Sequence, residues 1–464
     1  MTTLSYTTPW DTTFEDLPEQ RAGGPREIGG RPRLRVPVRD QVELRAVDLE
    51  SLVAADHPVR VIWAYVEQLD LSELEMRIKA REGHPGHPPI APRLLVALWL
   101  YATSEGVGSA RALARLCESH DAFRWLAGGV SVNPHTLSDF RVAYPALLDR
   151  LLSENVAALA VAGLIDLDTL AQDGLRVRAA AGASSFRRRR TLEKQLKRAG
   201  RVVARLKQEL QDDPDASNRR LQAAGERAAR EREARVAKAL AGLAALEKQK
   251  QEAAARTPKP GKPDDPPPGQ PADKPARELR VSTTDPEVRV LKMSDGGFRP
   301  GWNMQIASAV EQQIIVEVDV SSSGSDRGLA RPMLEAIRRR LGRLPRRHLA
   351  DGGFTTAADI EWAQREGVAL HCPPTRTKHR TDPFKPRAKD GPGVAVWRRR
   401  MKSPAGKGRY KRRAICECIN GRARRYGLHQ ITVRGRDKAL SLLRWFALAN
   451  NILQGHRLAC LATA

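Results

Sequence analysis

Cysteine is scarce in this sequence of 464 residues, and its placement argues against a disulfide framework. The cysteines are odd in number and scattered, whereas small disulfide-stabilised domains carry even numbers at short spacings. Cys416 and Cys418 flank Glu417, but on a helix they would point to opposite sides, and no second ligand pair accompanies them, so zinc is not expected. The five cysteines are Cys117, Cys372, Cys416, Cys418 and Cys460.

Long hydrophobic runs are also missing. Apolar stretches such as residues 94–102 and 156–165 fall far short of the roughly 20 residues that span a bilayer. Residues 1–13 are polar and lack the basic and then apolar segments of a secretory leader. No amphipathic or lipidated anchor is evident either. We therefore expect a cytoplasmic protein without a membrane partner.

Acidic residues are too few to balance the basic ones. Asp and Glu number 54 against 79 Lys and Arg, which gives a formal net charge of +25. Such an excess in a protein of this size points to a polyanionic partner, most often a nucleic acid. The length is typical of about two to four domains. Residues 1–45 are rich in Pro, Gly and Arg without hydrophobic periodicity, which predicts a disordered basic arm.

Residues 46–164 have helical periodicity and are predicted to form an all-α N-terminal DNA-binding domain. Two short helices, near residues 109–117 and 134–141, are separated by a segment that contains glycine. They could form a helix-turn-helix reader with Thr136 and Ser138 exposed, or they could simply pack in a bundle, and the sequence leaves both open. The apolar stripes of the preceding helices are Val59, Ile62, Trp63 and Val66, and then Leu94, Leu95, Leu98 and Trp99.

The pattern changes to alternation over residues 165–186, which predicts the first strand of a sheet. Three acids lie in this segment: Asp166, Asp168 and Asp173. A carboxylate inside a buried strand is costly unless it is paired or bound to a metal. One of these acids is therefore a candidate functional residue.

Residues 187–256 are nearly free of aromatics and dense in Ala, Arg, Glu, Lys and Leu. Apolar residues recur at helical spacing on either side of a break at residues 212–215, which predicts a helical hairpin or coiled coil inserted into the sheet domain. The run of arginines at 187–190 could contact DNA, although such runs are usually only solvated. Residues 257–284 are rich in Pro, Gly, Lys and Asp, and predict a disordered linker.

Alternating strands and helices return in residues 285–455, the predicted remainder of an α/β core. Two segments here share the sequence Asp-Gly-Gly-Phe, beginning at Asp295 and at Asp351. Asp295 precedes a strand, in a glycine-rich turn. Asp351 follows a short strand and leads into a helix, and functional sites gather at the carboxyl ends of strands in such sheets. Asp351 is therefore the stronger candidate.

The stretch around residues 410–424 holds one acid among many arginines. If this stretch is a single helix, Tyr410, Arg413, Glu417 and Arg424 fall within roughly 60° of one another on one face. A basic surface helix with one compensating glutamate would explain the composition. It would not explain why an aromatic, a carboxylate and two guanidinium groups lie on the same face.

Tyr410, Arg413, Glu417 and Arg424 follow the spacing of a motif that identifies a large group of insertion-sequence DDE transposases, and residues 89–141 resemble the helical domain that precedes their catalytic core. Arg424 stands where the group usually has Lys. The resemblance covers about residues 50–185 and 285–455. It implies an α/β RNase H-like core with a mixed sheet, after an all-α domain and interrupted by the helical insertion.

The resemblance also implies the site residues. Asp173, followed by Gly174 and a basic residue, matches the first acid of the family, although Leu175 replaces a small polar residue there. Asp351 and Glu417 match the second and third acids. These three would bind two Mg²⁺ ions, with Mn²⁺ as a substitute, because clustered carboxylates persist only if cations neutralise them. By the same resemblance, Tyr410, Arg413 and Arg424 would hold DNA phosphates.

The sequence thus predicts a DDE transposase that cuts double-stranded DNA at the terminal inverted repeats of a mobile element and joins the ends to target DNA. We expect it to act near the nucleoid, as a homo-oligomer on DNA. Residues 374–400, which are basic and include Trp397, are a candidate DNA-tracking loop, although Trp397 is more easily explained as a hydrophobic anchor. The alternatives are a repurposed DNA-binding protein without catalysis, and a nuclease of the same fold that cuts without joining.

Overall fold

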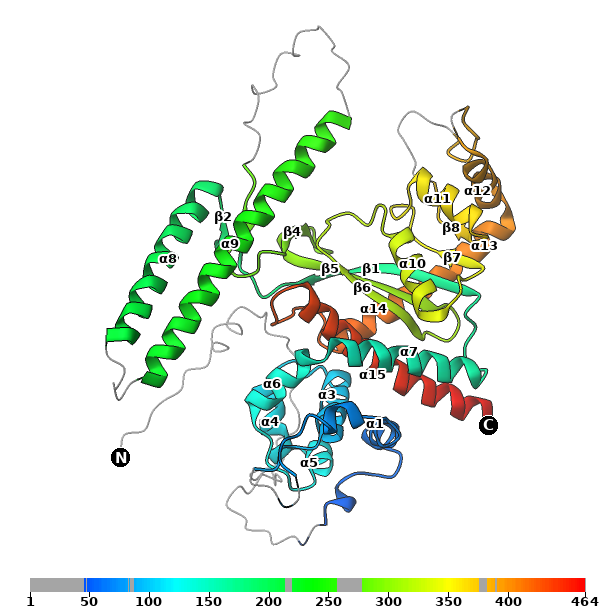
Figure 1. Ribbon diagram of the computed structural model, residues 1–464. Coiled ribbons are helices and arrows are strands. Elements are labelled where there is room, and N and C mark those ends of the chain that lie inside the picture. Colours follow the sequence, from blue (N-terminus) through cyan, green and yellow to red (C-terminus); the bar gives the residue numbers. More distant parts are fainter. Residues whose placement is uncertain are drawn as a thin grey trace, which may run out of the picture. The chain divides into compact units, whose positions relative to one another are not determined.

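The described part of the chain combines a helical N-terminal region, a mixed sheet flanked by helices, and a helical hairpin inserted after the first strand (Figure 1). The predicted arm, residues 1–45, and most of the predicted linker lie outside the described residues. The computed structural model describes residues 46, 48–81, 83, 87–212, 219–256, 278–374, 382–388 and 390–463.

Proline begins most helices of the N-terminal region because its fixed φ suits the first helical position, where no N–H partner is needed. The central helix is α3, in which every residue from Leu94 to Ser104 is buried. It contacts α1, α5, α6 and the C-terminal helix α15. The helices are α1 (Pro58–Glu67), α2 (Ser72–Glu75), α3 (Pro92–Ser104), α4 (Ala110–Ser119), α5 (Asp121–Ala127), α6 (Pro134–Ala143) and α7 (Pro145–Val161).

The two short helices predicted in this region are present as α4 and α6, but α5 lies between them, so they are not joined by a simple turn. The α6 helix is fixed to the bundle because the buried indole of Trp99 donates to the carbonyl of Leu137, at 2.9 Å. Thr136 and Ser138 are exposed on α6, as predicted. No helix among the described residues is long and apolar enough to cross a membrane.

The sheet is built around β1 (Thr169–Arg178), which carries Asp173 at its middle. It pairs antiparallel with β5 (Phe298–Ala309) on one side and parallel with β7 (Arg347–Leu349) on the other. β8 (Ala369–His371) extends the sheet beyond β7, while β4 (Arg289–Lys292) and β6 (Ile315–Ser321) both pair with β5. The predicted first strand and mixed sheet are confirmed, and β1 is a central strand. The topology is that of an RNase H-like core.

Helices of the second half cover this sheet. The long helix α15 packs against β6 as well as against α7 and α3, so the core and the N-terminal helices share one hydrophobic cluster. Asn451 on α15 pairs with both the N–H and the carbonyl of Ile315, at 2.8 and 2.7 Å. The helices are α10 (Ala330–Leu341), α11 (Ala357–Arg365), α12 (Pro392–Lys402), α13 (Pro404–Lys411), α14 (Ile415–Arg425) and α15 (Arg436–Thr463).

The candidate DNA-tracking loop is only partly a loop. Its second half forms α12, and Trp397 on that helix is buried, with its indole N–H donating to the carbonyl of Cys372 at 3.1 Å. The prediction that Trp397 is a hydrophobic anchor is confirmed. Residues 375–381 and 389 lie outside the described part.

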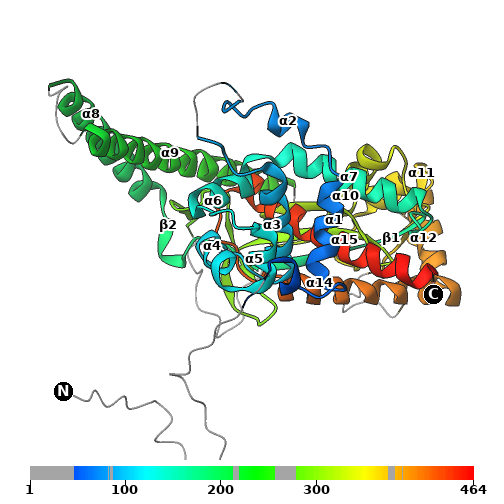
Figure 2. The same ribbon diagram turned by 90° about the horizontal axis from the view of Figure 1, so that it is seen from below.

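The insertion is a helical hairpin, as predicted. Its helices, α8 (Arg189–Asp212) and α9 (Arg219–Arg256), lie side by side (Figures 1 and 2). Leu192 on α8 and Val236 and Leu243 on α9 belong to a hydrophobic cluster separate from that of the core. The base of the hairpin is a short antiparallel pair, β2 (Phe186–Arg187) with β3 (Val281–Ser282), and Val281 joins the hairpin cluster.

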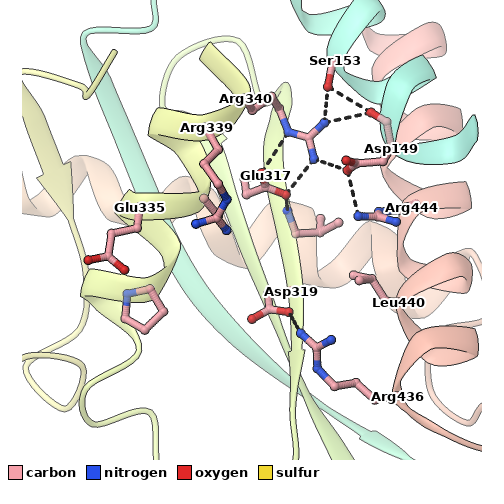
Figure 3. Close-up of a pocket in the computed structure, with 13 residues that line it drawn as sticks. Asp149, Ser153, Glu317, Asp319, Glu335, Arg339, Arg340, Arg436, Leu440 and Arg444 are labelled. Atoms are coloured by element: carbon pink, nitrogen blue, oxygen red, sulfur yellow. Dashed lines mark hydrogen bonds and ion pairs between the residues drawn. The ribbon is translucent and has the colours of Figure 1, made fainter. Parts of the chain in front are cut away.

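A buried ion-pair cluster connects α10, β6, α7 and α15 (Figure 3). The side chain of Arg340 is only 4% exposed and makes two hydrogen bonds of 2.9 Å to Glu317 and one of 2.7 Å to Asp149. Arg444 also reaches Asp149, at 2.8 Å, and Arg436 pairs with Asp319. Each of these three arginines therefore has its charge compensated by a carboxylate of the protein.

Candidate active site

Asp173 is the buried acid of the site, and its charge is met by donors from β1 and α14. One carboxylate oxygen accepts the N–H of Gly174 at 2.9 Å and lies 3.3 Å from Nη1 of Arg413. The other accepts the side-chain amide of Asn420 at 2.9 Å. Burial raises the pKa of Asp173 above its ordinary value, while Arg413, Gly174 and Asn420 act against that rise. The carboxylate is thus placed where a cation is favoured.

Position 174 favours glycine because polar side chains pack closely against the opposite face of the strand. A Cβ at this position would lie 2.7 Å from Oδ1 of Asp326, 2.7 Å from the amide nitrogen of Gln305 and 2.8 Å from the amide oxygen of Asn303. Those three side chains are hydrogen-bonded to one another at 2.6 to 3.1 Å. Any larger residue would push the backbone next to Asp173 out of place.

The parallel register of β1 and β7 places the end of β7, just before Asp351, next to the half of β1 that leads to Asp173. Thr169 pairs with Arg347 and Ala171 with Leu349, so the same register extended by two residues sets Asp173 opposite Asp351. Asp351 is exposed just past the end of β7, and its carboxylate accepts the N–H of Gly352 at 2.7 Å. A Cβ at Gly352 would lie 2.5 Å from the carbonyl of Pro373, so this turn also requires glycine.

Helix α14 covers the face of the sheet that carries both acids. Ala171 and Leu349, each two residues before one of the acids and so on the same face, form a cluster with Cys416 of α14. Glu417 is exposed and follows Cys416 directly. Because Arg413, Glu417 and Asn420 are spaced by four and three residues, Glu417 lies on the side of the helix from which its two neighbours reach Asp173.

The motif residues lie on one right-handed helical run that contains a 3₁₀ turn. α13 ends at Lys411, a 3₁₀ turn spans Arg412–Ala414, and α14 begins at Ile415. Tyr410 is nevertheless close to Arg413, whose guanidinium carbon lies 6.0 Å from the centre of the tyrosine ring. Arg424 is exposed on α14 one turn beyond Asn420.

The competing acids have other partners. Asp166 accepts the N–H of Asp168, at 2.8 Å, and Asp168 pairs with Arg343 at 2.9 Å, in the turn before β1. Asp295 accepts the N–H of Gly297 at 3.0 Å and pairs with Arg299 at 2.6 Å, in the turn between β4 and β5. These contacts explain all three as turn or surface residues.

The donor set fits a hard divalent cation, because it consists of carboxylates and its buried member already attracts a cationic partner. Within the described ranges, however, no three His, Cys, Asp or Glu side chains are gathered as a metal-binding group. Asp351 and Glu417 are exposed, so their side chains have room to turn toward Asp173. Arg413 occupies the cation position beside Asp173 in this structure.

Asn420 was missed in the sequence. Its signal was its spacing, three residues after Glu417 and seven after Arg413, which places it on the same side of a helix. Because its side chain is neutral, a search for charged and metal-binding residues passes over it. The structure brings it to 2.9 Å from Asp173.

Two family models match the chain. The model described as "Transposase domain (DUF772)" matches residues 47–143, and the model described as "Transposase DDE domain" (DDE_Tnp_1) matches residues 266–452. The second match includes Asp351, Glu417 and the motif residues, while Asp173 lies before it, on the other side of the insertion. No curated protein and no solved structure matches the chain significantly. With the RNase H-like core, the two matches show that the chain belongs to the insertion-sequence DDE transposases, DNA-binding and DNA-cleaving enzymes that use divalent metal ions.

Proposed function

We propose that this transposase cuts DNA at the ends of a mobile element and joins the freed ends to target DNA, with Asp173, Asp351 and Glu417 as the metal ligands. The observation that carries the proposal is that Arg413 and Asn420 both contact Asp173. The register of β1 and β7 supports Asp351 as its neighbour, and the contacts of Arg413 and Asn420 support Glu417 as the third acid.

The reaction consists of two phosphoryl transfers. In the first, a water oxygen attacks the phosphorus at the element end, the bond to the 3'-oxygen breaks, and a 3'-hydroxyl and a 5'-phosphate result. In the second, that 3'-hydroxyl attacks a phosphodiester of the target, whose own 3'-oxygen leaves. Two Mg²⁺ ions, for which Mn²⁺ would substitute, would lower the pKa of the attacking group and stabilise the charge on the leaving oxygen.

The chain's own residues would orient the ligands and the DNA. Asn420 holds one oxygen of Asp173 and so fixes the direction of the other. Nη1 of Arg413 is buried and makes no hydrogen bond to any described residue, which leaves this donor available for a phosphate oxygen once a metal ion compensates Asp173. Tyr410 beside it and Arg424 one turn further along α14 would continue the contact with the strand.

The test compares Asp173→Asn and Glu417→Gln with the wild type on a DNA fragment that carries the gene and its flanks. Both variants should lose cleavage in Mg²⁺ and keep DNA affinity, because each loses a metal ligand and leaves the basic surface intact. Cleavage by either variant at the wild-type rate would remove that residue from the site. Products in which cut ends are covalently joined to a second DNA distinguish a transposase from a nuclease that only cuts.

A further inference from the structure

A second basic site lies at the base of the helical hairpin, away from the acids. This hairpin-base pocket has a volume of about 530 Å³. Its polar lining comes from four segments: Arg198 of α8, Arg232 and Arg235 of α9, Thr283 and Thr284 after β3, and Arg434 before α15. Guanidinium groups from three separate parts of the chain therefore face one space.

Three of the four arginines of this pocket have no compensating acid among the described residues. Arg235 has Glu231 at 3.7 Å, but among the described residues Arg198, Arg232 and Arg434 have no acid within ion-pair distance. The acids next to Arg434 along the fold are already engaged. Asp285 accepts the N–H of Gly435 at 2.9 Å, and Glu287 pairs with Lys238 at 2.8 Å.

The pocket of Figure 3 shows how the same protein treats arginines that serve packing. There Arg340, Arg436 and Arg444 each meet a carboxylate, and only the exposed Arg339 has no ion pair among the described residues. Like charges that converge without such partners repel each other, and the repulsion is relieved when an anion binds between them. The contrast identifies the hairpin-base pocket as an anion site rather than a structural ion-pair cluster.

We infer that the hairpin-base pocket binds the phosphodiester backbone of DNA, as a contact separate from the catalytic site. This inference rests on the proposed function, which supplies DNA as the polyanion. Guanidinium forks and threonine hydroxyls are the groups that contact phosphate oxygens without reading sequence. No aromatic side chain lines the pocket, so it offers no platform for stacking an unpaired base. The insertion would thereby hold the duplex at a second point.

The test measures binding of the full-length protein to a labelled duplex at several salt concentrations. The variant Arg198→Ala/Arg232→Ala/Arg434→Ala should bind about tenfold or more weakly than wild type, with a log K against log salt slope shallower by about one to three, since each phosphate contact contributes about 0.9. The matched control, Lys197→Ala/Lys207→Ala/Arg227→Ala, removes the same charge from exposed positions on the opposite sides of α8 and α9. Its slope should stay close to that of wild type.

Two results would overturn the inference: a pocket variant with wild-type slope and affinity, or a control variant that loses as much as the pocket variant. The single variant Arg434→Ala changes a residue outside the hairpin helices and should reduce part of the slope of log K against log salt. A melting curve that matches that of wild type shows that a variant is folded. A wild-type protein that binds DNA without any salt dependence would instead contradict the proposed function. The two failures are therefore distinguishable.

Discussion

Asp173 keeps a carboxylate inside a sheet because donors on two elements offset its burial. Arg413 supplies charge, and Asn420 and the N–H of Gly174 supply hydrogen bonds. On the opposite face, the network around Asp326 requires glycine at position 174. Asp173 and Gly174 thus act together: the acid faces α14, and the absence of a side chain at Gly174 leaves room for the polar network on the opposite face.

We propose that only one of the two Asp-Gly-Gly-Phe segments, the one that begins at Asp351, belongs to the site, and mutation can separate the two. Asp351→Ala should eliminate cleavage, because it removes the carboxylate in register with Asp173. Asp295→Ala should keep most of the activity, because Asp295 is exposed, its partners Gly297 and Arg299 are close in sequence, and such surface ion pairs contribute little to stability. Parallel cleavage assays check both. An inactive Asp295→Ala beside an active Asp351→Ala would reverse the assignment.

His348 makes the fold sensitive to acid. It is fully buried on β7, with Nε2 3.0 Å from the side-chain oxygen of Gln172, and burial lowers its pKa to about 4. In the unfolded chain the His348 imidazole is protonated below about pH 6.5, whereas in the folded chain it is protonated only below about pH 4. Stability is therefore lost as pH falls through this window, by about 2 kcal/mol at pH 5.

His348→Gln should have a smaller difference in unfolding free energy between pH 7 and pH 5 than wild type, by about that amount. His371, whose pKa burial also lowers to about 4, remains in the variant and keeps part of the dependence. Denaturation curves at the two pH values measure the effect. An unchanged difference would mean that His348 is already charged in the folded protein.

At the scale of elements, the hairpin of α8 and α9 has its own hydrophobic cluster, which includes Val281 at its base but no strand of the main sheet. Replacing residues 189–256 by a short flexible linker should therefore leave a cooperatively melting protein. The same variant should bind DNA more weakly, because it loses most of the hairpin-base pocket. Aggregation with loss of cooperative melting would show that the sheet depends on the hairpin.

The cluster around Arg340 links four elements, and breaking one side of it should be costly. Arg340→Met leaves Glu317, 7% exposed, as an unpaired buried charge, which typically destabilises a protein by about 3 to 5 kcal/mol. The double variant Arg340→Met/Glu317→Leu should recover much of the loss, because no charge is then left unpaired. Melting temperatures of the two variants and wild type test this, and equal melting of all three would contradict it.

Much of the sheet could be predicted because the hydrophobic pattern of its strands has a different period from that of the surrounding helices and loops. The segments of β1, β5, β6, β7 and β8 all carried apolar or alternating patterns bounded by glycine or proline. The 3₁₀ turn between α13 and α14 carried no such signal, because Arg412, Arg413 and Ala414 do not interrupt a helical pattern. The helix α5 was missed because seven residues contain too few turns for periodicity.

The charged part of the site was visible in the sequence because acids in strands and ordered arginines are unusual. Its neutral part was not. Asn420 and the network behind Gly174 depend on contacts between segments more than a hundred residues apart, as in the hydrogen bond that the Gln172 amide donates to the side-chain oxygen of Gln305. Spacing along one helix cannot reveal a partner on a strand that lies before a long insertion.

At the scale of the whole molecule, the net charge of +25 is divided between two uses. Some arginines, such as Arg340 and Arg444, are paired inside the fold and hold elements together. Others, such as Arg198, Arg232 and Arg434, line one pocket without an ion pair to any described residue, and we propose that they contact a polyanion. In our proposal, the insertion adds a DNA contact to a core in which three acids carry the chemistry, and the insertion leaves the order of the main sheet intact.

The central claim is that Asp351, with Asp173 and Glu417, binds the catalytic metal. The most direct measurement is cleavage by Asp351→Cys in Mg²⁺ and in Mn²⁺, because a thiolate is a poor ligand for Mg²⁺ and a better one for the softer Mn²⁺. Asp295→Cys is the matched control and should cleave in both metals. We predict that Asp351→Cys is inactive in Mg²⁺ and regains cleavage in Mn²⁺, whereas wild-type cleavage by Asp351→Cys in Mg²⁺ would contradict the assignment.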